Sequence, residues 1–268
     1  MTLVQIIVLS LVQGLTEFLP VSCSAHLILG SWAFGWADQG LVFDVATHLG
    51  TLFAVLVYFR RDLAAMTASS LRPARTVEDR RNRSMLVAIV FASVPVLIVG
   101  FLARDLVEQY LRDVRVIAWM TIVFGLLLWL ADAWARRDRS LYDMRWKQAL
   151  LIGLAQVCAL VPGVSRSGVT ITAGRALGFA PDAAARFSFL LAIPIVAVAG
   201  GYGALKVLTG EAPIDWSQFL LALAFSAAAG WVCIAAFLAL LRRVGLLPFV
   251  LYRLALGVLL VWLVYGSP

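Results

Sequence analysis

The chain has 268 residues, of which 62% are apolar and 14% charged, with a formal net charge of +7 and a mean hydropathy of +0.94. A soluble core of this size cannot bury so much apolar surface, so the composition excludes a soluble globular protein and predicts a polytopic membrane protein. The three cysteines, Cys23, Cys158 and Cys233, follow no metal-binding or disulfide spacing.

Six apolar stretches are long enough to cross the hydrocarbon core of a bilayer, which needs about 20 residues. They are residues 41–59, 85–103, 116–135, 183–205, 217–241 and 246–265. Two further stretches, 3–36 and 148–179, are interrupted halfway by "PVSCS" and "PGVSRSG". Irregular backbone at membrane depth persists only where protein or water surrounds it, so both are predicted to be re-entrant helix-turn-helix elements. The predicted fold is an all-α polytopic integral membrane protein with a single membrane domain over residues 1–268.

The distribution of charge between the spans predicts the orientation in the membrane. The connections 60–83, 136–147 and 242–243 hold fourteen of the 22 Lys and Arg residues. The alternate connections, 104–115 and 206–216, hold four basic residues against five acids. By the positive-inside bias the first three are cytoplasmic and the other two face outward. Within apolar sequence, Arg166 and Arg253 are each interpreted as a buried ion-pair partner that holds helices in register. For Arg166, which lies amid Gly and Ser at a helix break, an anion clamp is the alternative.

The two interrupted stretches resemble each other. A shift of 143 residues pairs Gln13 with Gln156, Val21 with Val164, Ser22 with Ser165 and Ser24 with Ser167. Three predicted spans follow each copy, and an odd number of spans inverts the second copy relative to the first. We therefore expect a first inverted repeat over residues 1–135 and a second over 146–268, with the two breaks converging near the midplane.

Both breaks carry groups that suit phosphoryl chemistry. "PGVSRSGVT" (162–170) combines glycine, hydroxyls and Arg166 before a helix N-terminus, which suits phosphate oxygens. An alternative for "SRS" alone is close helix packing by small residues. The opposing break supplies Glu17 and His26 for acid–base work, with Cys23, Ser22 and Ser24 as candidate nucleophiles.

A second polar pair, Asp44 and His48, lies four residues apart on one predicted helical face. We interpret it first as a hydrogen-bonded pair within the membrane. An extension of the polar cavity is the alternative.

The segments "QGLTEFLPVSCSAHLIL" (13–29) and "PGVSRSGVTI" (162–171) resemble the two signature segments of the bacterial undecaprenyl pyrophosphate phosphatase family of the bacitracin-resistance type. The resemblance extends to "FDVATHLGT" (43–51), "ARFSFLLAIP" (185–194) and "PFVLYRLALG" (248–257). It implies hydrolysis of undecaprenyl pyrophosphate to undecaprenyl phosphate and inorganic phosphate, which recycles the lipid carrier for peptidoglycan synthesis and confers bacitracin resistance. It also implies the bacterial inner membrane, a site open to the periplasmic side, a long-chain prenyl pyrophosphate as partner, and no nucleic acid.

The resemblance implies roles for individual residues. Glu17 is the general base or a metal-facing carboxylate, His26 its partner acid, base or nucleophile, and Arg166 the phosphate ligand. The residues expected around the substrate are Gln13, Ser22, Ser24, Gly163, Ser165, Ser167 and Thr170, with Ser165 also a catalytic candidate.

Two positions bear on the chemistry within this pattern. The family usually has serine where this chain has Cys23, so the thiol either replaces a nucleophile or weakens a hydrogen bond to substrate. Gln13 offers only a neutral oxygen, which disfavours a tightly held metal. A divalent cation, Mg²⁺ or Ca²⁺, bridging Glu17 and the pyrophosphate is a hypothesis.

The alternative function is a lipid-phosphate or anion transporter, because inverted repeats with broken helices are the usual transporter plan. A carrier needs the arginine clamp but has no obvious use for Glu17 and His26 aimed at the same phosphate. A purely structural scaffold leaves these convergent polar groups without a role.

Overall fold

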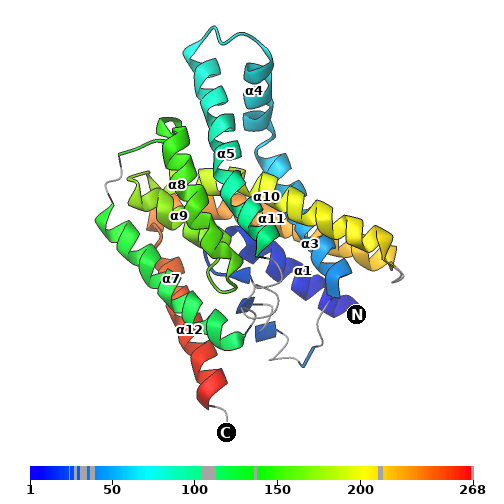
Figure 1. The fold of residues 1–268 in the computed structure, drawn as a ribbon. Helices are drawn as coiled ribbons and strands as arrows, with labels where there is room; N and C mark the ends of the chain where they lie inside the picture. Colours follow the sequence, from blue (N-terminus) through cyan, green and yellow to red (C-terminus); the bar gives the residue numbers. More distant parts are fainter. Residues whose placement is uncertain are drawn as a thin grey trace.

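The computed structural model describes residues 1–23, 25–26, 29–30, 35–36, 40–103, 113–135, 138–210 and 214–266. Its helices are α1 (Leu3–Phe18), α3 (Gly40–Tyr58), α4 (Arg60–Leu71), α5 (Val77–Leu102), α7 (Val114–Trp134), η1 (Leu141–Asp143), α8 (Trp146–Gln156), η2 (Val157–Leu160), α9 (Arg166–Ala176), α10 (Pro181–Thr209), α11 (Trp216–Val244) and α12 (Leu247–Gly266). Figure 1 shows α4 and α5 as a hairpin that projects from the other helices, while α7 and α12 run side by side toward the opposite end.

The described residues contain six helices that are long and apolar enough to cross a membrane, namely α3, α5, α7, α10, α11 and α12. Each overlaps one of the six predicted stretches, so the all-α polytopic membrane fold is confirmed. Large apolar side chains remain exposed on these helices; Phe101 and Trp134 are both 82% exposed. So much exposed apolar surface is expected where lipid, rather than water, covers the protein.

Two shorter apolar segments, α1 and the run Trp146–Leu160 formed by α8 and η2, end at the predicted breaks. The second run gives way to irregular residues 161–165 and then to α9, which matches the element expected over 148–179. After the first break, residues 23, 25–26 and 29–30 are helical, and the remainder of the 3–36 element is only partly within the described residues. Each interrupted stretch therefore contains a helix that stops at a Pro-containing and Ser-containing turn.

The serines at the two breaks share an unusual backbone conformation. Ser22 and Ser165 are the non-glycine residues with positive φ in the described part of the chain, at 70° and 69°. Such a conformation costs a side-chain-bearing residue about 1–3 kcal/mol and persists only where the surrounding structure enforces it. Because the shift of 143 residues pairs these same two serines, the shared turn supports an internal repeat.

The contacts between helices also relate the two proposed copies of the repeat. The helix that opens each proposed copy packs against the second span of the other copy: α1 against α11, and α8 against α5. Gly14 permits the first contact, because an added Cβ would lie 2.6 Å from the Ser226 carbonyl oxygen. Gly153 permits the second, where a Cβ would overlap the Ala92 backbone. The boundaries of the inverted repeats stay a prediction.

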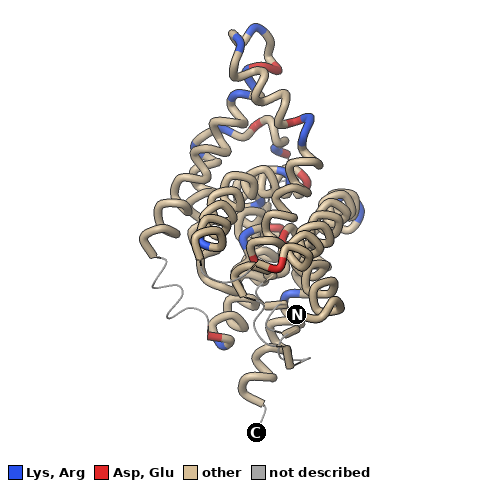
Figure 2. Tube along the Cα trace, turned by 90° about the vertical axis from the view of Figure 1, so that its right-hand side faces the viewer, with Lys and Arg blue, Asp and Glu red and all other residues tan. Residues whose placement is uncertain are grey.

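Charged side chains are distributed unevenly along the molecule. Figure 2 shows Lys and Arg gathered on the projecting α4–α5 hairpin. Ion pairs also tie helices together: Arg175 Nε of α9 lies 2.7 Å from Asp132 Oδ1 of α7, and Arg186 Nη2 of α10 lies 3.3 Å from Asp62 Oδ2 of α4. The uneven distribution agrees with the positive-inside argument, although the side of the membrane stays a prediction.

Candidate active site

Residues from both breaks border one pocket of about 320 Å³. The first break contributes Thr16, Glu17, Ser22 and Cys23, and the second contributes Pro162, Gly163, Ser165 and Arg166. His48 of α3 adds a polar group, and Val96, Ile195, Val196 and Ala199 are among the residues that make the remaining wall apolar. The two predicted chemical segments therefore meet in space, 149 residues apart at their central contact.

That central contact joins Glu17 and Arg166. Arg166 Nη2 lies 3.0 Å from Glu17 Oε1, and the two side chains are only 14% and 9% exposed. Arg166 Nη1 donates to the Ser188 carbonyl oxygen at 3.0 Å. A guanidinium carries five N–H donors, so the group has further donors for an anionic ligand. The pair places a phosphate-binding cation and a proton-accepting carboxylate side by side.

The other carboxylate oxygen of Glu17 faces an amide and an imidazole. Gln13 Nε2 donates to Glu17 Oε2 at 2.9 Å and lies 3.4 Å from His48 Nε2. His48 Nδ1 must carry a proton, because it lies 2.7 Å from the Asp44 carbonyl oxygen, which can only accept. In the neutral ring Nε2 is therefore the acceptor, 4.0 Å from Glu17 Oε2.

The position of His48 is compatible with both interpretations of its pair with Asp44. His48 is hydrogen-bonded to Asp44, through the backbone carbonyl of that residue. Its ring also lines the pocket, so His48 extends the polar cavity. The contact between Gln13 and His48 could not be predicted from the sequence, because these two residues are 35 positions apart.

The hydroxyls of the second break divide into two groups. Ser165 lines the pocket and caps α9, its Oγ accepting from the Gly168 N–H at 3.1 Å. Ser167 and Thr170 are buried. Ser167 Oγ donates to the Leu19 carbonyl at 2.8 Å, and Thr170 Oγ1 lies 2.7 Å from Ser188 Oγ. The last two residues therefore tie the break to its surroundings and do not line the pocket.

Arg253 of α12 connects the two breaks. Its fully buried guanidinium donates to Pro20 O at 3.3 Å in the first break, and to Gly163 O and Val164 O at 3.0 Å each in the second. Arg253 Nε also donates to Thr121 O at 3.2 Å. The predicted ion pair is not what the structure has at Arg253, because the partners of its guanidinium here are backbone carbonyls. The sequence feature that singled out Arg253 was its position well inside an apolar span.

His26 lies away from Glu17. Its Nδ1 donates to the Ser22 carbonyl at 2.7 Å, so its Nε2 accepts from the Tyr252 hydroxyl at 2.7 Å. Its ring stacks on Tyr252 and lines a different, mainly apolar pocket of about 430 Å³. His26 therefore does not line the Glu17 pocket. The predicted site residues that do line it are Glu17, Arg166, Cys23, Ser22, Ser165 and Gly163. Ser24 lies outside the described residues.

The donors at this pocket are poorly suited to a resident metal ion. The described residues contain no group of three or more His, Cys, Asp or Glu side chains that could hold one. Of the described lining residues, Glu17 is the one carboxylate, and it already faces the Arg166 guanidinium. A divalent cation normally requires several oxygen ligands, so the side chains present do not form a metal site without oxygens from another source.

Comparison with known proteins places the whole chain among similar sequences. A family model described as bacitracin resistance protein BacA matches residues 6–259. Undecaprenyl-diphosphatase 1 of Pseudoalteromonas translucida is 48% identical over 258 residues, 96% of this chain and 97% of that protein. Undecaprenyl-diphosphatase 2 of Stutzerimonas stutzeri is 51% identical over 272 residues, 99% of this chain and 100% of that protein. Undecaprenyl-diphosphatase of Alcanivorax borkumensis is 51% identical over 262 residues, covering 97% and 98% of the two chains.

Proposed function

The chain belongs to the bacitracin resistance protein BacA family, and from this premise we propose that it is a membrane phosphatase that hydrolyses undecaprenyl diphosphate to undecaprenyl phosphate and inorganic phosphate. The observation that carries the proposal is the contact between Arg166 and Glu17 in a pocket with largely apolar walls. The names of the similar proteins support the same activity, and the comparisons give no support to the transporter alternative.

Arg166 and the N-terminus of α9 would bind the terminal phosphate. The first N–H groups of a helix have no intrahelical acceptors and form a favourable site for an anion. Ser165 satisfies the N–H of Gly168, so the N–H groups before it are the ones that would meet phosphate oxygens. The guanidinium adds charge-assisted hydrogen bonds to the same ligand.

Glu17 would accept the proton of the attacking group. Gln13 holds the carboxylate through a hydrogen bond of 2.9 Å, and His48 presents Nε2 on the same wall. We assign His48 the role of the imidazole that exchanges a proton with the departing or attacking oxygen. His26 is proposed as a positioning residue, because its hydrogen bond goes to the backbone of Ser22.

Water and the Cys23 thiol are two attacking groups available at the pocket, and each gives a balanced reaction. In the first, water attacks the terminal phosphorus, its proton passes to Glu17, and the bridging P–O bond breaks with its electron pair leaving on undecaprenyl phosphate. In the second, the Cys23 thiol gives its proton to Glu17, the thiolate attacks the terminal phosphorus, and the same P–O bond breaks with its electron pair leaving on undecaprenyl phosphate, which takes up that proton. Water then attacks the phosphorus and loses a proton to Glu17, and the S–P electron pair returns to sulfur as phosphate is released. Trapping of a phosphorylated protein by acid quench distinguishes them, because the first reaction forms none.

The isoprenoid chain would lie on apolar surface beside the phosphate site. The mainly apolar pocket of about 430 Å³ between α1, α11 and α12 shares Thr16 with the Glu17 pocket. We place the isoprenoid units next to the diphosphate there, in a protein of the bacterial inner membrane whose site opens to the periplasmic side.

The experiment measures phosphate release from undecaprenyl diphosphate by purified protein in detergent. Glu17→Gln and Arg166→Ala are expected to lower kcat/KM by about 100-fold or more, the usual effect of removing an acid–base or charge-stabilising group. Arg186→Gln is the matched control, because Arg186 pairs with Asp62 outside the pocket. Parent-like rates in both pocket variants would overturn the proposal.

A further inference from the structure

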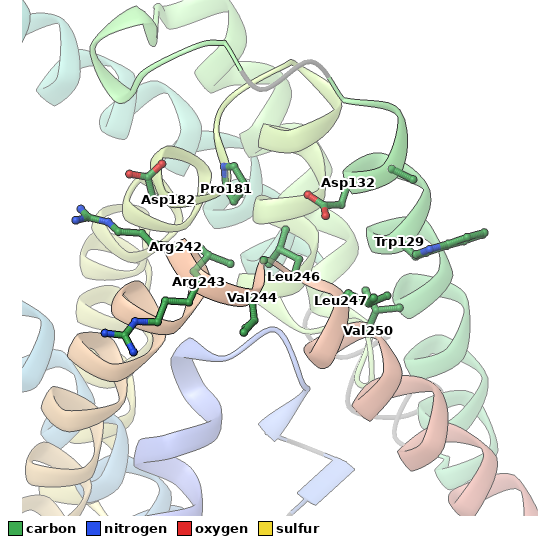
Figure 3. A pocket seen from close by; sticks show the side chains of 13 residues that line it. Trp129, Asp132, Pro181, Asp182, Arg242, Arg243, Val244, Leu246, Leu247 and Val250 are labelled. Atoms are coloured by element: carbon green, nitrogen blue, oxygen red, sulfur yellow. The ribbon is translucent and has the colours of Figure 1, made fainter.

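A second large pocket lies at the turn between α11 and α12, and Figure 3 shows it from close by. Its volume is about 590 Å³, which is ample for a lipid headgroup or another small polar ligand. It is lined by Trp129, Asp132, Ala133, Pro181, Asp182, Leu241 to Leu247 and Val250, and shares none of these residues with the Glu17 pocket.

The charges around this pocket are unbalanced toward positive. Arg242 and Arg243 end α11, both are exposed, and neither forms an ion pair with a described residue. The charge of Asp132 is matched by buried Arg175 at 2.7 Å. Of the described lining residues, Asp182 is then the one acid left against two guanidinium groups, so these residues leave the pocket with an excess positive charge.

The arginines and the large apolar side chains lie on opposite sides of the pocket. In Figure 3 Arg242, Arg243 and Asp182 lie on one side, and Trp129, Leu247 and Val250 lie on the other, with Asp132 above them. Arg242 and Arg243 belong to the last turn of a membrane-spanning helix of 29 residues. Side chains at the end of a span lie at the depth of lipid headgroups, where arginine and tryptophan are favoured.

We propose that this pocket binds the headgroup of an anionic phospholipid in the leaflet next to the basic connections. The two guanidinium groups contact the phosphate, and Trp129, Leu247 and Val250 contact the adjoining acyl chain. Basic pockets between membrane helices favour such headgroups because the local charge is complementary and water is partly excluded.

Occupation of this pocket also bears on the catalytic half of the molecule. Val250 lines the pocket less than one helical turn before Arg253, whose guanidinium holds both breaks. A bound headgroup therefore stabilises the beginning of the helix on which the breaks depend. The proposal itself does not rest on the phosphatase assignment.

The test measures retained lipid by native mass spectrometry while purified protein in detergent is titrated with phosphatidylglycerol, cardiolipin or zwitterionic phosphatidylethanolamine. Arg242→Gln/Arg243→Gln is expected to weaken binding of the anionic lipids about ten-fold or more, since each basic side chain contributes about five-fold. The matched control is Arg60→Gln/Arg61→Gln, which removes the same charge from exposed residues that line none of the pockets described above. The control is expected to bind like the parent.

A charge-conserving variant and a competing anion distinguish headgroup binding from non-specific attraction. Arg242→Lys/Arg243→Lys keeps the charge and should retain most of the binding, which guards against a variant that fails to fold. Equal loss in both glutamine pairs would mean non-specific attraction and would overturn the proposal, as would equal retention of phosphatidylethanolamine. Displacement of the lipid by millimolar inorganic phosphate would overturn it too, because the pocket would then take a free anion. Phosphate release by all three variants in detergent should match the parent.

Discussion

Ser22 and Ser165 share a positive φ, of 70° and 69°, at positions that a shift of 143 residues superimposes. Each serine directly precedes a helical residue that lines the pocket, Cys23 or Arg166. The strain that positive φ causes in a residue with a side chain is confined to that residue, so it can be tested by substitution of the serine.

The effect of a substitution at Ser22 on stability should depend on whether the new side chain is branched at Cβ. Ser22→Gly is expected to unfold close to the parent temperature, because glycine adopts positive φ without strain, whereas Ser22→Val should lose about 1–3 kcal/mol. Thermal unfolding in detergent measures the difference. Ser93→Val, at a buried serine in helical α5, is the control for the same change of side chain where φ is helical. An equal loss in Ser22→Gly and Ser22→Val would count against strain at this turn.

Arg253 should be needed for an intact pocket although it does not line it. Arg253→Met removes the one guanidinium that donates to the carbonyl oxygens of Pro20, Thr121, Gly163 and Val164. We expect a loss of about 3 kcal/mol or more in unfolding free energy, together with a large fall in phosphate release. Arg253→Lys keeps the positive charge but loses the planar guanidinium. An ammonium group has three donors and cannot reach the carbonyls of both breaks at once, so this variant shows whether the shape of the guanidinium or its charge is needed. Full activity in Arg253→Lys would contradict the bridging role.

The two histidines should respond differently to truncation. His48→Ala is expected to lower kcat by about 100-fold, and added imidazole should restore part of the rate, because the missing group faces the pocket. His26→Ala should lose activity through movement of the Ser22 turn, so imidazole should not restore it. Thermal unfolding of both variants supplies the structural control. Rescue of His26→Ala with no rescue of His48→Ala would reverse the assignment.

Cys23 reports the accessibility of the pocket. In a Cys158→Ser background, a membrane-impermeant maleimide is expected to label Cys23 in intact cells, since the thiol lines an open pocket while Cys233 is buried. The exposed Cys158 is removed because it would contribute background. Excess inorganic pyrophosphate should slow the labelling if the phosphate site lies beside the thiol. Labelling that begins only after lysis would place the opening on the other side of the membrane.

Any divalent cation should bind together with the substrate. Removal of metal by EDTA is expected to lower phosphate release, and Mg²⁺ or Ca²⁺ should restore it with an apparent affinity that rises with substrate concentration. The reason is that Glu17 provides one carboxylate, so phosphate oxygens must complete the ligand set. A metal that survives dialysis against EDTA in stoichiometric amount would contradict this expectation. Unchanged activity in EDTA would remove the cation from the reaction.

The sequence predicted the spans well because a membrane helix is specified by a long local run of apolar residues. The second interrupted element could also be predicted from the sequence, because "PGVSRSG" interrupts a run of apolar residues. The break observed in the structure occupies residues 161–165. The meeting of Glu17 with Arg166 followed from an argument about inverted repeats. It required no knowledge of side-chain positions, and the structure brings the pair to 3.0 Å.

Side-chain direction at the turns could not be predicted in this way. Glu17 and His26 are nine residues apart in sequence, yet the left-handed turn at Ser22 sends their side chains to different pockets. His48 and Arg253 reach the breaks from other helices, 35 residues from Gln13 and 233 from Pro20. Such contacts depend on tertiary packing, which local patterns do not encode.

The carbonyl contacts of Arg253 have a consequence for biosynthesis. Glu17, His48 and Arg166 all precede α11 in the chain, whereas Arg253 belongs to α12, which is translated after all of them. A nascent chain that does not yet include α12 thus carries the pocket groups and lacks the donor that holds Pro20 and Gly163 in place. Translation products that stop before α12 would accordingly be inert toward phosphate esters, and the enzyme would become competent only once α12 had inserted.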